Sequence, residues 1–269
     1  MSEVRILAPC GILGYGYPES SFLEGMKRDP HAIVVDAGST DAGPHKLGAG
    51  VAIVSPEACK KDLRPMIRHG IRRKIPVVIG SAGGSGAKKH VDWTYGLIAD
   101  VLKEEGLTDV KIAVIWADIP HAAVEKAMNE GTLSPLGKTV PQITKERLYA
   151  TTRMVAQMGH EPIVAALETG ADIILCGRAY DPAPFAAVAA LHKGDLALGY
   201  HMGKILECAA LCAVPGTTKD CMLGALQEDS FVISPLSDRR VCTPLSVAAH
   251  TFYEKDHPYL LHGPGWMLD

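Results

Sequence analysis

Short acidic and hydroxyl side chains gather in a loop that follows a buried apolar run, Ala32–Asp36. The loop has the sequence DAGSTDAGP, in which Ser39 and Thr40 lie between Asp36 and Asp41. Small residues let a backbone approach a ligand closely, and a carboxylate can move a proton. A capped turn is the structural alternative, because these residues also hydrogen-bond to nearby N–H groups. The length of the loop and its two aspartates favour function, with Asp36 and Asp41 as candidate catalytic groups and Ser39 and Thr40 as candidate substrate-binding groups.

A glycine-rich loop, GSAGGSG from Gly80 to Gly86, precedes a predicted helix. Backbone N–H groups at a helix N-terminus favour a phosphate or a carboxylate. The loop matches neither GxxxxGK[ST] nor GxGxxG, so NAD and ATP are not supported as cofactors. A general anion site and a purely structural turn both remain open. The candidate substrate-binding residues of this loop are Ser81, Gly83, Gly84 and Ser85.

A third loop, CGRAYDP, places a guanidinium beside a carboxylate at the end of another apolar run. Arg178 is a candidate for holding a substrate carboxylate or phosphate through two parallel hydrogen bonds. Asp181 is a candidate catalytic acid or base. The structural alternative is an internal Arg178–Asp181 ion pair that fixes the loop.

Four acids at the ends of apolar runs could face one cleft: Asp36, Asp41, Asp118 and Asp181. Oxygen-only ligands of this kind suit a hard divalent cation such as Mg²⁺. The cofactor is otherwise unknown from the sequence, and no metal ligand is assigned.

Histidines in loops are candidate bases because the imidazole pKa lies near working pH. His45 and His90 flank the first two loops, and His201 and His250 lie further along the chain. A histidine satisfied within the structure is the alternative for each. His45 is the candidate catalytic residue among them. No HExxH, GxSxG or Cys-His signature is present.

These loops require a scaffold that brings strand ends together. Five Val- and Ile-rich runs that scarcely alternate are typical of strands buried on both faces: Val4–Ala8, Ala32–Asp36, Pro76–Gly80, Lys111–Trp116 and Asp172–Cys176. Helical patterns between them predict an α/β fold, a doubly wound, mostly parallel sheet with helices on both faces. In an open sheet of this kind, ligands bind beyond the carboxyl ends of the strands.

The character of the sequence changes at about Gly194. We predict a parallel α/β core over residues 1–193 and a C-terminal extension over 194–269, packed on the same domain. Within the extension, GYHMGKILECAALCA and TPLSVAAHTFYEK predict helices, GTTKDCMLGAL a turn and helix, and SFVISPL an edge strand. Trp266–Leu268 resembles the beginning of a further strand.

Bulk composition excludes some function classes. A net charge of −3 and a pI of about 6.4 give no electrostatic case for nucleic acid or for an anionic membrane. No stretch approaches the length of a membrane span, and no signal peptide precedes the first strand. Seven irregularly spaced cysteines in mostly apolar surroundings favour reduced thiols and a cytoplasmic location.

Four long segments of the chain are VVDAGSTDAGPHKLGAG, IPVVIGSAGGSGA, ILCGRAYDPAPFAA and CTPLSVAAHTFYEKDHPYLLHGPG. Together they resemble the acyclic terpene utilization (AtuA-like) family, from Arg5 to Gly265. The resemblance implies that the chain stops inside the family's usual extent, as a fragment or one subunit of a split protein. It implies functional roles for these residues: Asp36, Gly38, Ser39, Thr40, Asp41, Ser81, Gly83, Gly84, Gly177, Arg178, Asp181, Thr243 and His250. His45-Lys46 replaces the family's more usual aromatic pair, which implies a different substrate.

The family's namesake belongs to a pathway that breaks down terpenoid acids as CoA thioesters. We therefore expect an enzyme acting on a small carboxylic acid or its acyl-CoA, as a lyase or hydratase. One alternative is a hydrolase of an amide, lactone or thioester, with Ser39, Ser81 or Ser85 as nucleophile. The other is a non-catalytic ligand-binding subunit of a heteromeric enzyme. The expected partners are a small anionic substrate and either further copies of the chain or a second subunit.

Overall fold

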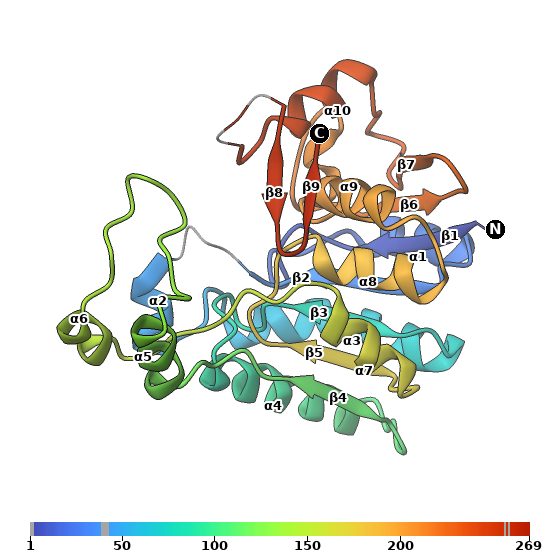
Figure 1. Ribbon diagram of the computed structural model, residues 1–269. Coiled ribbons are helices and arrows are strands. Elements are labelled where there is room, and N and C mark those ends of the chain that lie inside the picture. The colour runs from blue at the N-terminus through green and yellow to red at the C-terminus, as the bar shows by residue number, and fades with distance from the viewer. Residues whose placement is uncertain (1–2, 39–42, 256, 258) are drawn as a thin grey trace.

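The chain folds around an open seven-stranded sheet with the strand order β4-β5-β3-β2-β1-β6-β7. A computed structural model describes residues 3–38, 43–255, 257 and 259–269 (Figure 1). The five parallel strands confirm the five predicted runs: β1 (Val4–Ala8), β2 (Ala32–Asp36), β3 (Val77–Gly80), β4 (Ile112–Ile115) and β5 (Ile173–Cys176). The predicted α/β, doubly wound, mostly parallel sheet is therefore confirmed.

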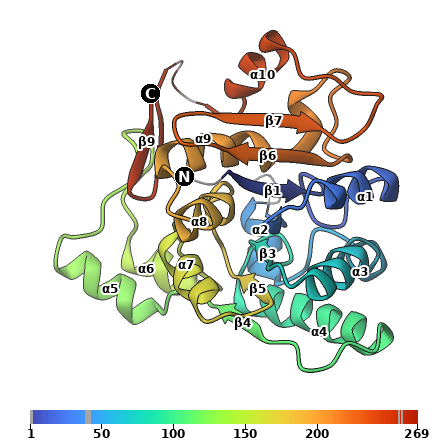
Figure 2. The same cartoon turned by 90° about the vertical axis from the view of Figure 1, so that its right-hand side faces the viewer.

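Helices cover both faces of this sheet (Figure 2). On one face, a core cluster joins the strands to α1 (Glu19–Lys27), α3 (Pro56–Arg73) and α4 (Lys88–Glu104). On the other face, a second cluster joins them to α7 (Glu161–Glu168), α8 (Ala183–Leu191) and α9 (Leu196–Leu206). Two apolar cores thus enclose the sheet, which fixes the positions of the strand ends.

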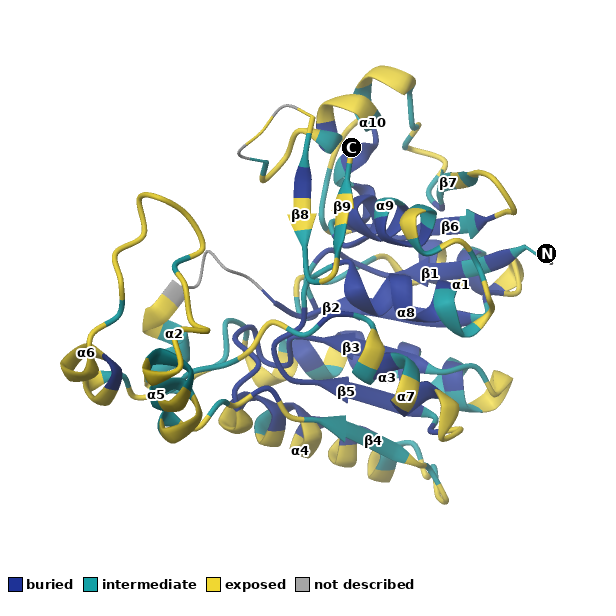
Figure 3. Cartoon of the chain, viewed as in Figure 1, coloured by how far each residue is buried: buried dark blue, intermediate teal, exposed yellow. Residues whose placement is uncertain are grey.

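The sequence of the central strands explains this double burial. Successive side chains of a strand point to opposite faces, so a strand covered on both sides must be apolar throughout. Val34 and Val78 lie in one core cluster, whereas their chain neighbours Val35 and Ile79 lie in the other. Strands β2, β3 and β5 are buried along their whole length, as Figure 3 shows.

The strand order determines which face each helix covers. From β1 through β2 and β3 to β4 the chain moves in one direction across the sheet, and a right-handed crossover then places α1, α3 and α4 on the same face. The chain returns from β4 to β5, so α7 covers the opposite face. Strands β3 and β5 are neighbours whose following helices, α4 and α8, lie on opposite faces. Their carboxyl ends are therefore the switch point of the sheet, the place beside which ligands bind in open α/β folds.

The region after residue 193 contributes to the same sheet. Strand β6 (Met222–Leu226) pairs antiparallel with β1, and β7 (Phe231–Pro235) forms the edge, as predicted for SFVISPL. The prediction of a helix in GTTKDCMLGAL is wrong, because pairing with strands on both sides outweighs the weak strand propensity of Met-Leu-Gly-Ala-Leu. The boundary at 193/194 stays a prediction.

Beyond β7 the chain forms α10 (Pro244–Thr251) and a hairpin of β8 (Leu261–Gly263) and β9 (Trp266–Leu268). The predicted helix and the predicted strand at Trp266 are thereby confirmed. A short 3-10 helix at Ala209–Cys212 follows α9, so the predicted helix is divided in two. Three small helices extend past the carboxyl edge of the sheet in Figure 1: α2 (Gly43–Ala49), α5 (His121–Asn129) and α6 (Lys145–Ala150). Among the described helices, none is long and apolar enough to cross a membrane.

Candidate functional site

The loops that follow β3 and β5 are held together by one serine. Ser81, the first residue after β3, is fully buried, and its hydroxyl donates a hydrogen bond to the Ala179 carbonyl at 3.1 Å. The same oxygen accepts hydrogen bonds from Ala179 N (3.1 Å) and from Nη1 of Arg178 (2.8 Å). A hydroxyl with one donated and two accepted bonds is saturated. Ser81 therefore fastens the loop after β5 to the loop after β3.

The glycine-rich loop is packed inside the protein. Residues 81–87 are all buried, and the N–H groups of Ser81, Ala82, Gly84 and Gly86 each donate to a backbone carbonyl. At the N-terminus of α4, the Lys88 N–H donates to Oδ2 of Asp118 at 2.7 Å. Most donors that a phosphate would need are thus used within the chain. This geometry favours the structural turn over the anion site.

Glycine is required where this loop touches its neighbour. Gly86 has φ +67°, and a Cβ at this position would lie 2.1 Å from the backbone nitrogen of Arg178. A Cβ at Gly38 would lie 2.5 Å from Nη1 of Arg178. The small residues of the three loops therefore allow the backbones to approach and hold Arg178 in place.

The guanidinium of Arg178 is buried but only partly engaged. Nη1 donates to Ser81 and, at 3.0 Å, to Oδ1 of Asp181, which confirms the predicted internal ion pair. Nη2 is buried and has no hydrogen-bond partner among the residues that the structure describes. A charged donor without a partner in a buried position is costly, and it calls for a ligand. The ion pair therefore engages Nη1 and leaves Nη2 without a partner in the described part of the chain.

Arg178 lines a cavity of about 590 Å³, within the range of roughly 300–1,000 Å³ that is typical of small-molecule sites. Asp181, Lys204 and Glu254 complete its polar wall. The β8–β9 hairpin supplies part of the opposite wall through residues 261–264, and Tyr180 adds an aromatic surface. The cavity thus combines two cations, two carboxylates and an apolar side.

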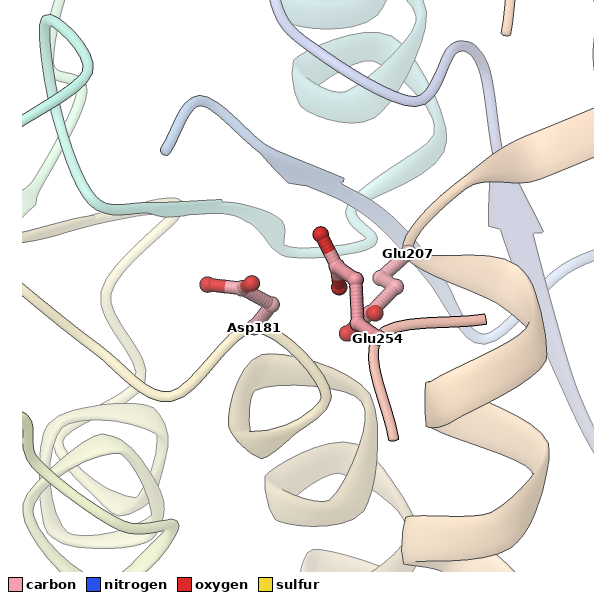
Figure 4. Close-up of side chains that lie close together, drawn as sticks. All are labelled: Asp181, Glu207 and Glu254. Carbon is pink, nitrogen blue, oxygen red and sulfur yellow. The ribbon is translucent and has the colours of Figure 1, made fainter. Parts of the chain in front are cut away.

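Three carboxylates converge beside this cavity (Figure 4). Asp181 precedes α8, Glu207 follows α9, and Glu254 lies after α10, and each offers an oxygen within 4.8 Å of the others. Lys204 donates to Oε1 of Glu207 at 2.5 Å and to Oε2 of Glu254 at 3.0 Å. The residues come from segments far apart in the sequence, which only the fold brings together.

A second, smaller cavity of about 70 Å³ adjoins the first, because Asp181 and Glu254 line both. Asp36, at the end of β2, and Glu207 also line it. Oδ1 of Asp36 and Oε2 of Glu207 are buried, and neither has a hydrogen-bond partner in the described part of the chain. The structure therefore brings two of the predicted acids, Asp36 and Asp181, to one place.

Burial dominates the protonation of these groups. It raises the pKa of Asp36 and of Glu207 well above their usual ranges and raises the pKa of Asp181, and the neighbouring carboxylates add to the shifts of Asp36 and Glu207. Burial lowers the pKa of Lys204, but Glu207 and Glu254 outweigh it, and the net shift is upward. The ammonium of Lys204 therefore stays charged, whereas Asp36, Asp181 and Glu207 bind protons more readily than exposed carboxylates do.

Several predicted residues lie elsewhere. Ser39, Thr40 and Asp41 are outside the described residues. His45 is exposed on α2, and Asp118, also exposed, holds the N-terminus of α4 instead of joining Asp36 and Asp181. The predicted four-aspartate ligand set is therefore not assembled by its described members.

The remaining candidates have contacts within the protein. Thr243 forms a capping box with Ser246 at the start of α10. Gly83 and Gly84 pack against His90 and Ile53, and Ser85 is buried. His250 is buried on α10, and its ring stacks on Tyr253 with centroids 5.7 Å apart. Burial lowers the pKa of His250 to about 4, with a further contribution from the charge of Lys204.

Sequence reasoning missed the roles of Lys204, Glu207 and Glu254. A signal for the first two exists, since a Lys and a Glu three residues apart interrupt an otherwise apolar helical run. Charges on such a helix are rarely buried unless they are paired. Glu254 gives no comparable signal, because it lies among polar residues at the end of a helical pattern.

Fold and site together define an α/β protein with a doubly wound sheet and a cavity with one charged wall at the carboxyl edge of that sheet. The sequence profile of the acyclic terpene utilisation family protein AtuA matches residues 56–224. The chain therefore belongs to the AtuA family, as the loop motifs suggested. The matched segment contains Arg178, Asp181, Lys204 and Glu207. No curated protein and no solved structure matches the chain.

Proposed function

We propose that this chain is an enzyme that acts on a small carboxylic acid or its acyl-CoA thioester, as a lyase or hydratase. The observation that carries the proposal is Arg178, which lines a cavity of about 590 Å³ and whose buried Nη2 has no hydrogen-bond partner among the described residues. A substrate carboxylate or phosphate is the group that a guanidinium binds best. Nη1 of Arg178 already donates to Ser81 and Asp181, so Nη2 is the nitrogen left for such an anion.

The chemistry of this proposal is a proton transfer next to the bound anionic group. Asp181 and Glu254 line the same cavity as Arg178, so a substrate held there lies beside two carboxylates. A lyase removes a proton from the carbon next to a carbonyl while a leaving group departs from the following carbon. A hydratase adds a proton to the first carbon and the hydroxide of water to the second. Asp181 is the acid proposed from the sequence that faces this cavity. The apolar wall suits the carbon skeleton of the substrate.

The hydrolase alternative loses support at Ser81. Its hydroxyl is buried and saturated by hydrogen bonds, so it cannot attack a carbonyl without breaking them. Ser85 is buried as well. A serine-reactive probe that labelled Ser39, Ser81 or Ser85 would restore this alternative. A separate proposal concerns location. We propose a cytoplasmic location, because all seven cysteines are free thiols.

The test is turnover on a panel of short carboxylic acids and their CoA thioesters, followed by the absorbance of the double bond formed or lost. Arg178→Lys keeps the charge but removes the planar fork, and we expect kcat/KM to fall about 100-fold. Asp181→Asn should lower kcat by a similar factor. Arg239→Lys, at an exposed position, is the matched control and should be neutral. Undiminished turnover in both site variants would contradict the proposal.

The non-catalytic alternative is a ligand-binding subunit of a heteromeric enzyme. It predicts that the purified chain binds the substrate through Arg178 but turns it over only when a second polypeptide is added. Size-exclusion chromatography of the chain from its native source, with mass spectrometry of any co-purifying protein, distinguishes this alternative from the enzyme.

A further inference from the structure

The carboxylates of the smaller cavity are only half engaged by the protein. Arg178 bonds to Oδ1 of Asp181, and Lys204 bonds to Oε1 of Glu207 and to Oε2 of Glu254. In each carboxylate the second oxygen receives no hydrogen bond from these two cations. One oxygen from each of the three residues lies within 4.8 Å of the others, a separation that a single ion can bridge.

Asp36 provides an observation that is independent of this cluster. It comes from β2, it is 3% exposed, and none of the described residues donates a hydrogen bond to its Oδ1. It lines the same cavity as Asp181, Glu207 and Glu254. A buried carboxylate oxygen without a donor is rare in folded proteins and is expected to have a ligand. Oε2 of Glu207 is likewise buried and has no hydrogen-bond partner among the described residues.

The charges leave room for one further cation. Four carboxylates line the cavity, and Arg178 and Lys204 supply two positive charges to them, so two negative charges remain when all the acids are ionised. Protons can neutralise this excess, and so can one divalent ion. A volume of about 70 Å³ exceeds the roughly 30 Å³ that a water molecule occupies, so the cavity accepts an ion together with water.

We propose that Asp36, Asp181, Glu207 and Glu254 bind one hard divalent cation, of the Mg²⁺ or Mn²⁺ class, in this cavity. Oxygen donors without nitrogen or sulfur select such ions, and both retain some bound water. Lys204 then holds the outer oxygens of two ligands and orients them, as partners of ligating carboxylates commonly do. The inference does not depend on the proposed reaction, because it concerns binding alone.

The experiment is a titration of the purified full chain with Mn²⁺, followed by isothermal calorimetry and by the electron paramagnetic resonance signal of free Mn²⁺. We expect one saturable site per chain, from which Mg²⁺ displaces Mn²⁺. Glu207→Gln keeps the size of the side chain and removes a ligand charge, and it should weaken binding at least about tenfold. Glu168→Gln, at an exposed position on α7, is the control and should bind as the wild type does.

Asp36→Asn is the second variant, in case Glu207→Gln does not fold. A folded Asp36→Asn protein should also bind Mn²⁺ at least about tenfold more weakly. The thermal unfolding midpoint of the wild type should rise with added Mg²⁺, and that of a folded site variant should not. Wild-type protein without a saturable site at millimolar Mn²⁺, or equal affinity in the site variants and Glu168→Gln, would overturn the proposal. If Mn²⁺ binds but Arg178→Lys retains full turnover, the cation site stands and the proposed function fails.

Discussion

Buried polar groups occur both in the glycine loop after β3 and beside the two adjoining cavities. The two regions differ in how many of these groups have hydrogen-bond partners. In the loop, four N–H groups and the Ser81 hydroxyl all have partners within the chain. At the two cavities, Oδ1 of Asp36 and Oε2 of Glu207 beside the smaller one and Nη2 of Arg178 beside the larger one have no partner among the described residues. Buried polar groups with complete partners stabilise a fold, whereas incomplete ones cost stability and indicate a ligand.

At this edge of the sheet, the polar groups with partners support the fold, and the polar groups without partners mark the candidate site. The loop allows three backbones to meet and thereby fixes Arg178. Arg178 then lines the larger cavity together with the carboxylates of Asp181 and Glu254. Substitutions in the loop should therefore act first on stability, and substitutions in the cavity first on binding.

Gly86→Ala should have the largest effect. Its Cβ would lie 2.1 Å from the backbone nitrogen of Arg178, and its φ of +67° is unfavourable for alanine. Strain and overpacking together predict a loss of about 3 kcal/mol or more in the free energy of unfolding. Urea denaturation followed by circular dichroism measures it.

Gly96→Ala is the matched control for this change. Gly96 lies in α4, and a Cβ there meets no atom within 4 Å. Alanine in a helix interior should add about 0.5–1 kcal/mol to the free energy of unfolding. If Gly86→Ala were as stable as the wild type, the loop would not be the rigid support that the structure indicates.

Much of the fold could be predicted from the sequence, because burial on both faces leaves a strong pattern. The five Val- and Ile-rich strands were predicted within one residue at each end, and the helix predicted after the glycine-rich loop is α4. Strand β6 was not, since Met-Leu-Gly-Ala-Leu has no β-branched residue and becomes a strand only through its pairing with β1 and β7. Local propensity carries no information about such partners.

The site could be predicted in part. Asp36, Arg178 and Asp181 follow strands, and the rule that ligands bind at strand ends located them. Lys204, Glu207 and Glu254 come from α9 and from the segment after α10, and the packing of α9 on α8 and β6 brings the first two to the cavity. No spacing in the sequence encodes that packing. A rule based on strand ends cannot find residues that helices supply.

His250 should make the stability of the acidic region depend on pH. Its folded pKa of about 4 lies below the ordinary value of 6.5, because burial and the charge of Lys204 disfavour the imidazolium. Between these values the unfolded chain binds a proton that the folded chain does not, so the free energy of unfolding rises with pH. The contribution is lost as pH falls from 6.5 toward 4, and it amounts to about 2–3 kcal/mol.

The variant His250→Asn isolates this contribution from the carboxylates with raised pKa, which act in the opposite direction. Urea denaturation at pH 7 and pH 4.5 should show a smaller pH-dependent loss in the variant than in the wild type. Parallel pH profiles of the two proteins would mean that His250 does not titrate in this range. Thr243→Ala, which removes only a helix cap, should leave the profile unchanged in shape.

Asp118→Ala should have the smallest effect and bears most directly on the glycine loop. The change removes the carboxylate that accepts the Lys88 N–H at 2.7 Å, and losing such a cap costs about 1 kcal/mol. Because the wild-type carboxylate already occupies the N-terminus of α4, inorganic phosphate should not raise the unfolding midpoint of the wild type beyond chloride at equal ionic strength. In Asp118→Ala the N-terminus is open, and phosphate should recover part of the lost stability. A phosphate-specific rise in the wild type would instead make the loop an anion site, and the contrast between a satisfied loop and an unsatisfied cavity would no longer hold.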